Sequence, residues 1–356
     1  MFNVLKLGVV GVIVAMAALL AGSVAAAPSD DVFTVTNLVA DSGSSAAAVD
    51  PSLVNPWGLS DGPTTPWWTS NNGSNTSTLY SGTGAKQALT VAVAGGPSGT
   101  VFNGSTTDFM VSQNGTSGPA RFLFATEGGT ILGWSPTVNG TTAIPGVDES
   151  SQKAVFKGLA TVNDRLYATD FHNNRVDVFD ASFNPVSLPG GFKDAKLPKG
   201  YAPFGIQVLS GNVFVTYAKQ DAAKHDDVAG GGFGYVDEFT PDGKLVARVA
   251  TGGRKNAPPN APWGLALAPS SFGPFSGDLL VGNFGNGRIS AYKDNGGGKW
   301  VYKGQLRQGD GTPIAIDGLW AIAFGNGSAA GPTTSLYFAA GPGGEAHGLF
   351  GTVTAG

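Results

Sequence analysis

The chain has 356 residues, among them 55 glycines, 22 prolines and no cysteine, and its 21 basic and 25 acidic residues give a net charge of −4. This weak charge, spread along the chain, argues against a nucleic acid as partner, because phosphate binding needs a clustered basic surface. Without cysteine the chain has no disulfide and no thiolate zinc site, so its stability must come from apolar burial and backbone pairing.

The first 27 residues have the pattern of an export signal. Lys6 supplies the positive charge, an apolar run follows over 7–20, and small residues then form a cleavage zone. We expect cleavage after Ala25 or Ala26, although the same run could be retained as a membrane anchor, for which it is short. Cleavage leaves 28–356 as one domain with a net charge of −5, secreted or periplasmic and without membrane contact.

The middle of the chain holds the clearest copy of a repeated unit. Apolar and polar residues alternate along 158–162, 165–170 and 175–180, and two turns rich in Asn and Asp separate these runs. Alternation with a period of two, broken by such turns, is typical of a three-stranded β-meander. Five further copies follow the same pattern and begin near Trp57, Arg121, Pro203, Pro262 and Leu319.

Six copies predict an all-β, six-bladed β-propeller. One meander cannot bury its apolar face alone, whereas six arranged radially shield one another and leave only short edges. The run 32–38 has no partners in its own copy, so we expect it to pair beside 349–354 as the outer strand of the last blade and close the ring. A sandwich of two sheets also uses many short strands, but it does not account for the recurring opening of the Pro-Trp-Gly type.

Several segments resemble known propeller families. Leu166–Asp180 resembles an NHL repeat, and Leu279–Tyr292 is similar to a second, weaker copy. The segments 55–59, 66–73 and 260–266 resemble a family of exported bacterial proteins of uncharacterised function, over nearly the whole mature chain. The resemblance implies an NHL-like six-bladed propeller of bacterial source and no particular reaction. The wider group includes calcium-dependent lactonases and peptidyl-amide lyases beside propellers that only bind partners, so function has to be argued from a site.

Asn and Asp side chains recur at equivalent points of the repeat, at the starts of inner strands and the ends of second strands. A ring of such side chains could supply the oxygen ligands that Ca²⁺ prefers. The same residue types also cap turns by bonding to backbone amides, so the two interpretations compete. The residues that we assign to a possible calcium site are Asn55, Asp170, Asn283 and Asp317.

Large aromatic residues also recur at one place in the repeat. Trp57, Trp263 and Trp320 stand near the starts of inner strands, as does Phe204. These four could line the central channel as a platform for a sugar or another flat ligand, or they could pack between blades as core. His172 follows Asp170 in a turn and is the candidate base in the channel.

The longest charged insertion is 219–227, which contains His225. Such a loop could overhang the channel as a lid or docking segment, or it could be a solvated flexible loop. The histidine spacings match no zinc motif of the HExxH type.

Two functions remain open at this point. The first is an extracytoplasmic propeller that binds an unknown protein or carbohydrate through its loop face. The alternative is a calcium-dependent, lactonase-like hydrolase or lyase in which the metal polarises a carbonyl in the central channel. The enzyme needs several oxygen ligands within about 2.3–2.6 Å of one point, whereas a binding module needs an exposed aromatic or apolar patch.

Overall fold

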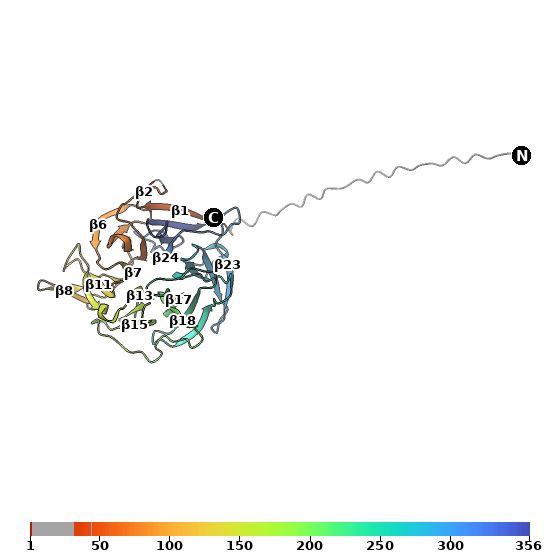
Figure 1. Cartoon of the computed structure of the whole chain (residues 1–356). Coiled ribbons are helices and arrows are strands. Elements are labelled where there is room, and N and C mark those ends of the chain that lie inside the picture. The colour runs from red at the N-terminus through yellow and green to blue at the C-terminus, as the bar shows by residue number, and fades with distance from the viewer. Residues whose placement is uncertain (2–31, 44) are drawn as a thin grey trace.

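The computed structural model describes residue 1, residues 32–43 and residues 45–356 (Figure 1). The predicted export signal over 1–27 therefore lies outside the described residues, apart from Met1, and its cleavage stays a prediction. Among the helices in the described part of the chain, none has the length and apolar character needed to span a bilayer.

The strands form six small sheets around a central axis, numbered here as blades 1 to 6 in chain order (Figure 1). Blade 1 contains β3 (Pro56–Ser60), β4 (Trp67–Asn71), β5 (Thr76–Tyr80) and β6 (Lys86–Ala92). Blade 2 contains β7 (Pro97–Phe102), β10 (Phe122–Thr126), β11 (Thr130–Trp134) and β12 (Ile144–Asp148). Blade 3 contains β13 (Phe156–Val162), β14 (Arg165–Asp170) and β15 (Arg175–Phe179).

The second half of the ring continues the same order. Blade 4 contains β16 (Tyr201–Leu209), β17 (Asn212–Lys219), β18 (Gly234–Phe239) and β19 (Leu245–Ala250). Blade 5 contains β20 (Pro262–Leu267), β21 (Leu279–Asn283), β22 (Ile289–Asp294) and β23 (Trp300–Gln305). Blade 6 contains β24 (Leu319–Phe324), β25 (Leu336–Ala340), β26 (Leu349–Ala355), β1 (Phe33–Ala40) and the short β2 (Ala48–Val49).

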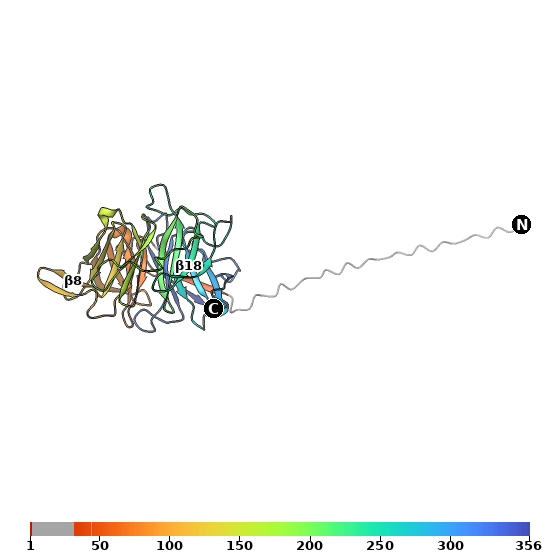
Figure 2. The same ribbon diagram turned by 90° about the horizontal axis from the view of Figure 1, so that it is seen from below.

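The first strand of each blade lies at the axis and contacts the first strands of both neighbouring blades, so that β3, β7, β13, β16, β20 and β24 form a closed ring. Figure 2 shows the blades standing side by side, with connecting loops at both ends of the ring. Apolar side chains fill the spaces between blades and form the core. The prediction of a six-bladed β-propeller is confirmed.

The ring is closed by a strand from the N-terminal side. β1 pairs antiparallel with β26, with Phe33 opposite Ala355 and Ala40 opposite Leu349. Phe33 is buried and packs on Phe272, with ring centroids 5.0 Å apart. This pairing confirms the prediction that the run 32–38 completes the last blade. It fastens both ends of the fold in one sheet without a disulfide.

Glycines bring the inner strands into direct backbone contact. A Cβ on Gly205 would lie 2.1 Å from the carbonyl oxygen of Trp263, and one on Gly264 would lie 2.5 Å from that of Trp320. The space left on the axis beside these strands is a cavity of about 40 Å³. The recurring Pro-Trp-Gly opening therefore has a packing reason. We call this constriction the glycine waist, formed by Gly58, Gly99, Gly158, Gly205 and Gly264.

Two blades depart from the common pattern. Blade 2 carries an additional hairpin between its first and second strands, β8 (Met110–Gln113) and β9 (Thr116–Pro119), which projects from the rim (Figure 1). Blade 3 has three strands in the described part of the chain. After β15 the chain makes one bridge, between Phe179 and Pro185, and then leaves the sheet edge.

Candidate functional site

One end of the ring gathers the loops that join the second and third strands of each blade, together with the starts of the inner strands. Side chains from different blades meet here, because the first strands of all blades run in the same direction along the axis. We call this end the mouth. Its loops are 72–75, 127–129, 171–174, 220–233, 284–288 and 341–348.

A buried lysine lies at the centre of the mouth. Lys157 is the second residue of β13, and its side chain is fully buried. Its Nζ donates to Glu127 Oε1 at 2.5 Å and to Asp226 Oδ1 at 3.2 Å. The same ammonium lies 4.7 Å from the ring centre of Trp57. A buried ammonium is costly unless paired, and here carboxylates from blades 2 and 4 and an aromatic face from blade 1 surround it.

Two further carboxyl groups, those of Asp227 and Glu345, lie near enough to Lys157 for its charge to lower their pKa values. Burial raises the pKa of Asp227 to about 7, against the opposing effect of the Lys157 charge, and its buried Oδ2 has no hydrogen-bond partner among the described residues. Burial also raises the pKa of Glu345 in the loop of blade 6, although Asn55 Nδ2 donates to its Oε2 at 2.7 Å. Burial alone would raise the pKa of Asp226, but the charges of Lys157 and His225 lower it below its ordinary value.

The predicted aromatic residues do come together, as the floor of the mouth. The ring of Trp320 stacks on that of Trp57 with centroids 3.7 Å apart, and it lies 5.8 Å from Phe204 and 6.0 Å from Trp263. All four side chains are at least nine-tenths buried. They form one core cluster beneath the charged groups, so the core interpretation describes their packing, and their role as a ligand platform stays a prediction.

No hydrogen bond joins the four residues assigned to calcium to one another in the described part of the chain. Asp170 Oδ1 accepts from the backbone N–H groups of Val155 and Asn173, and Asn283 Oδ1 accepts from that of Asn260. These bonds are the turn chemistry that competed with the metal interpretation.

The other two members of that set are also hydrogen-bonded. Asn55 bonds to Glu345 and to Trp320 Nε1, and the exposed Asp317 accepts from the backbone of Gly343. The four side chains fit a calcium shell poorly, because their oxygen atoms are already engaged. The calcium assignment stays a prediction without support from this geometry.

The histidines lie near the mouth in different settings. His172 is partly buried in the loop after β14, and its ring makes no hydrogen bond within the described residues. His225 Nδ1 lies 3.1 Å from Asp226 Oδ1, and Glu127, His225 and Asp226 bring their ligand atoms within 4.8 Å of one another. The ammonium of Lys157 already contacts both carboxylates of that group, so the cation held there is the lysine.

Sequence reasoning missed the central lysine and most of the carboxyl groups around it. The signal available was a single charged residue, Lys157, inside an otherwise apolar run from Ala154 to Ala160. Burial of an unpaired charge costs folding free energy, so a lysine in a buried strand indicates that a carboxylate lies nearby. The partners themselves, Glu127 and Glu345, stand in glycine-rich turns where nothing in the local sequence marks them.

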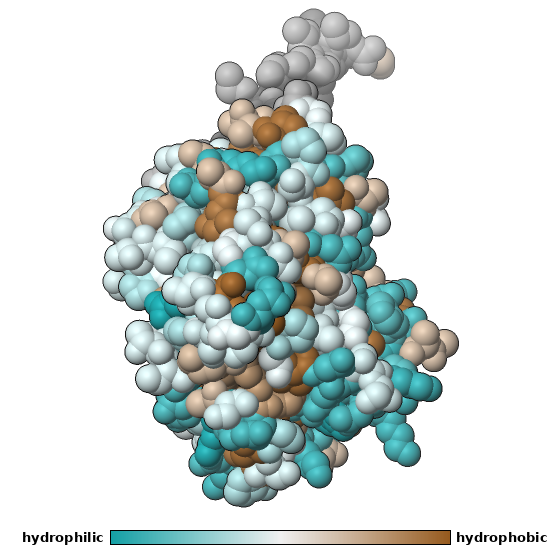
Figure 3. Space-filling view, turned by 90° about the vertical axis from the view of Figure 1, so that its left-hand side faces the viewer, coloured by the Kyte–Doolittle hydropathy of each residue, from teal (hydrophilic) through white to brown (hydrophobic). Residues whose placement is uncertain are grey.

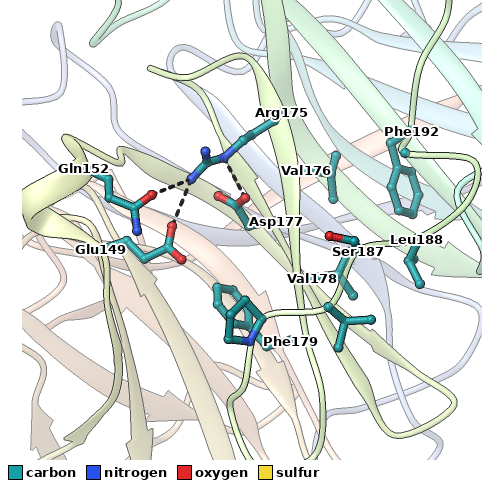
Figure 4. Close-up of a pocket in the computed structure, with 13 residues that line it drawn as sticks. Glu149, Gln152, Arg175, Val176, Asp177, Val178, Phe179, Ser187, Leu188 and Phe192 are labelled. Carbon is teal, nitrogen blue, oxygen red and sulfur yellow. Dashed lines mark hydrogen bonds and ion pairs between the residues drawn. The ribbon is translucent and has the colours of Figure 1, made fainter.

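A second cavity lies on the outer rim of blade 3, where a fourth strand is absent. It measures about 430 Å³ and is lined by β15 and the segment that follows it (Figure 4). Arg175 bonds Glu149 at 3.0 Å and Asp177 at 2.6 Å across its edge. Burial raises the pKa of Asp177 to about 7, against the charge of Arg175. This ion-pair network fixes the exposed edge of blade 3.

Comparison with known proteins places the chain among uncharacterised relatives. No protein-family model matches it. Uncharacterized protein R648 of Acanthamoeba polyphaga mimivirus is 31% identical over 301 residues, which are 81% of this chain and 73% of R648. The chain belongs to the same family as R648. Uncharacterized protein R640 of the same virus is 33% identical over 230 residues, but the chain spans only 42% of the length of R640.

Solved structures resemble this member of the R648 family in fold alone. A streptogramin B lyase aligns with a TM-score of 0.53 at 13% identity, covering 91% of this chain and 97% of that one. A glucose dehydrogenase aligns with a TM-score of 0.54 at 14% identity, covering 91% and 100%. Because these two propellers carry different reactions, the shared architecture selects neither for this chain.

Proposed function

We propose that the chain is an extracytoplasmic, NHL-like binding propeller that takes a carbohydrate at its mouth. The observation that carries the proposal is a group of four carboxyl groups from three blades around one buried lysine. Glu127 and Asp226 accept hydrogen bonds from the ammonium of Lys157, and the charge of Lys157 acts on the pKa values of Asp227 and Glu345. Ligand hydroxyl groups donate hydrogen bonds to carboxylates, and this cluster offers more acceptor oxygens than its one lysine can satisfy.

A purely structural ion pair would not need this arrangement. One or two carboxylates are enough to pair a buried ammonium, and each additional carboxyl group held in a buried place costs folding free energy, as the raised pKa values of Asp227 and Glu345 record. Perturbed carboxyl groups gathered in one place are typical of functional sites. Side chains around Lys157 remain accessible, since Asp226 is 61% exposed and His225 is 47% exposed.

The test is retention of oligosaccharides by the purified chain on an array of neutral glycans. We expect specific retention by the wild-type protein and its loss in Glu127→Gln, which keeps the shape of the side chain but removes the charge facing Lys157. Asp164→Asn is the matched control, because Asp164 is an exposed carboxylate in the turn between β13 and β14, at the opposite end of blade 3. Retention that is absent in the wild type, or equal in Glu127→Gln, would overturn the proposal.

A second candidate is acid–base catalysis of hydrolysis or elimination at the same mouth, as in the lactonase-like alternative. The observation that favours it is the pKa of Asp227 at about 7 beside Lys157, since a general acid or base works best with a pKa near the operating pH. The test is hydrolysis of the aryl lactone dihydrocoumarin, followed by absorbance with and without added Ca²⁺. Turnover that falls in Asp227→Asn supports this candidate, and an unchanged rate refutes it.

A further inference from the structure

A third cavity lies between blades 1 and 2, at the end of the ring opposite the mouth. It measures about 520 Å³, within the range of about 300–1,000 Å³ usual for small-molecule sites. Two loops between first and second strands form its walls: the proline-containing loop 61–66 of blade 1 and the insertion 103–121 of blade 2. In blades 3 and 4 the corresponding turns are short, at 163–164 and 210–211.

Aromatic rings form the base of this cavity. Trp68 stacks on Phe122 with centroids 4.1 Å apart and lies 4.7 Å from Trp134, while Phe102 lies 5.3 Å from Phe122. The Nε1 of Trp134 donates to the carbonyl of Gly140 at 3.0 Å, which fixes that ring. The rings are therefore held in place before a ligand arrives. A preformed, largely apolar cavity of this kind binds flat apolar groups.

One positive charge stands at the edge of the rings. Arg121 lies immediately before β10, and its guanidinium carbon is 5.1 Å from the ring centre of Phe102. Its Nη1 donates to the carbonyl of Ser105 at 2.9 Å, a bond that anchors the side chain to the insertion of blade 2. No carboxylate lies within 4.0 Å of Arg121 among the described residues, whereas Arg165, Arg175 and Arg248 each have at least one.

We propose that this cavity binds a small aromatic molecule that carries an anionic group. The aromatic part would lie against Trp68, Phe122 and Trp134, and the anion would pair with the free donors of Arg121. A guanidinium suits this role because its forked donors match a carboxylate. The site is separate from the mouth, since its loops 61–66 and 103–121 join first to second strands, at the end of the ring opposite the loops that form the mouth.

The surface around this cavity agrees with a small ligand rather than a large partner. Figure 3 looks at the rim from the side on which β8 projects in Figure 1, and its apolar side chains lie in small groups between hydrophilic ones. Large apolar interfaces between proteins need contiguous patches. A small aromatic cavity with one charge at its edge does not need such a patch to bind a small ligand.

The experiment is isothermal titration calorimetry at pH 7 with two matched probes, 2-naphthoate and the uncharged 2-naphthamide. We expect the wild-type chain to bind naphthoate about tenfold more tightly than naphthamide, because a hydrogen bond to a charged group adds about that much. Arg121→Gln should remove this preference and leave naphthamide binding unchanged. Arg254→Gln, which removes an exposed arginine from the loop after β19, is the charge-matched control and should change neither affinity.

A second variant locates the binding site. Thr64 is exposed and lines the cavity, so Thr64→Trp should fill the cavity from the surface without disturbing the core, and it should abolish binding of both probes. The proposal is overturned if neither probe binds the wild type, if Arg121→Gln keeps the preference for naphthoate, or if Thr64→Trp binds as the wild type does. None of these outcomes depends on whether the mouth binds a carbohydrate.

Discussion

Replacing Gly205 by alanine tests whether backbone contact at the glycine waist holds the blades together. The new Cβ would lie 2.1 Å from the carbonyl oxygen of Trp263 and 3.0 Å from Thr216 Oγ1. An ordinary contact at this position is 3.4–4 Å, so the inner strand of blade 5 would have to retreat by more than 1 Å. That strand also carries Trp263, whose ring packs against Trp320 at 6.0 Å.

Overpacking of a core costs about 1–3 kcal/mol, and we expect Gly205→Ala to reach the upper end because the obstacle is backbone. With an unfolding entropy of about 2.1 cal/mol/K per residue, ~3 kcal/mol lowers the melting temperature of a domain of this size by roughly 4–5 °C. Urea unfolding followed by far-ultraviolet circular dichroism measures the change. An unfolding free energy within about 0.5 kcal/mol of the wild-type value would refute the reasoning.

The control for this experiment is Gly140→Ala. No atom lies within 4 Å of a Cβ at Gly140, and its φ is not positive. An alanine there restricts only the unfolded chain, so we expect it to be neutral or to stabilise by about 0.4–1 kcal/mol. The change in unfolding free energy should therefore be destabilising at Gly205 and neutral or stabilising at Gly140. A general intolerance of glycine replacement would destabilise the fold at both positions.

Three further predictions follow from the closing strand, the rim of blade 3 and the N-terminus. Phe33→Ala should lower the unfolding free energy by about 3–5 kcal/mol in urea, whereas the exposed Thr36→Ala in the same strand should change it little. Asp177 keeps its proton in the folded state up to a pKa of about 7, against an ordinary value of 3.8. Its stabilising contribution is therefore full below about pH 4 and lost as the pH rises to about 7. Asp177→Asn should flatten the decline of melting temperature across that range. Finally, N-terminal sequencing of exported protein should begin at Ala26 or Ala27.

The architecture could be predicted because its determinants are local. Alternation of apolar and polar residues, turns rich in Asn and Gly, and an unpartnered run at 32–38 were enough for the blade number and the closing pair β1–β26. The number of strands in each blade could not be predicted in this way. The repeat as read from the sequence has three strands, which blade 3 keeps, whereas the other blades have at least four. The segment after β15 has turn residues like those of other blades, and only packing decides that it leaves the sheet.

The site was harder to predict because its members are far apart in the sequence. Glu127, Lys157, Asp226 and Glu345 lie in different repeats, and only closure of the ring brings them together. The Asn and Asp residues were ambiguous for another reason. A side-chain oxygen such as that of Asp170 can accept a hydrogen bond from a backbone amide as readily as it can bind a metal ion. The local sequence does not show which of the two partners the fold provides.

The glycine waist also determines what the axis of this ring can transport. The cavity on the axis measures only about 40 Å³, far below the roughly 300–1,000 Å³ usual for a small-molecule site. A solute of that size therefore does not fit at the waist, and it reaches the other end of the ring by diffusing around the outside. A ligand bound at one end therefore does not pass through the ring to the other, and the two ends exchange their ligands with the surrounding solution separately.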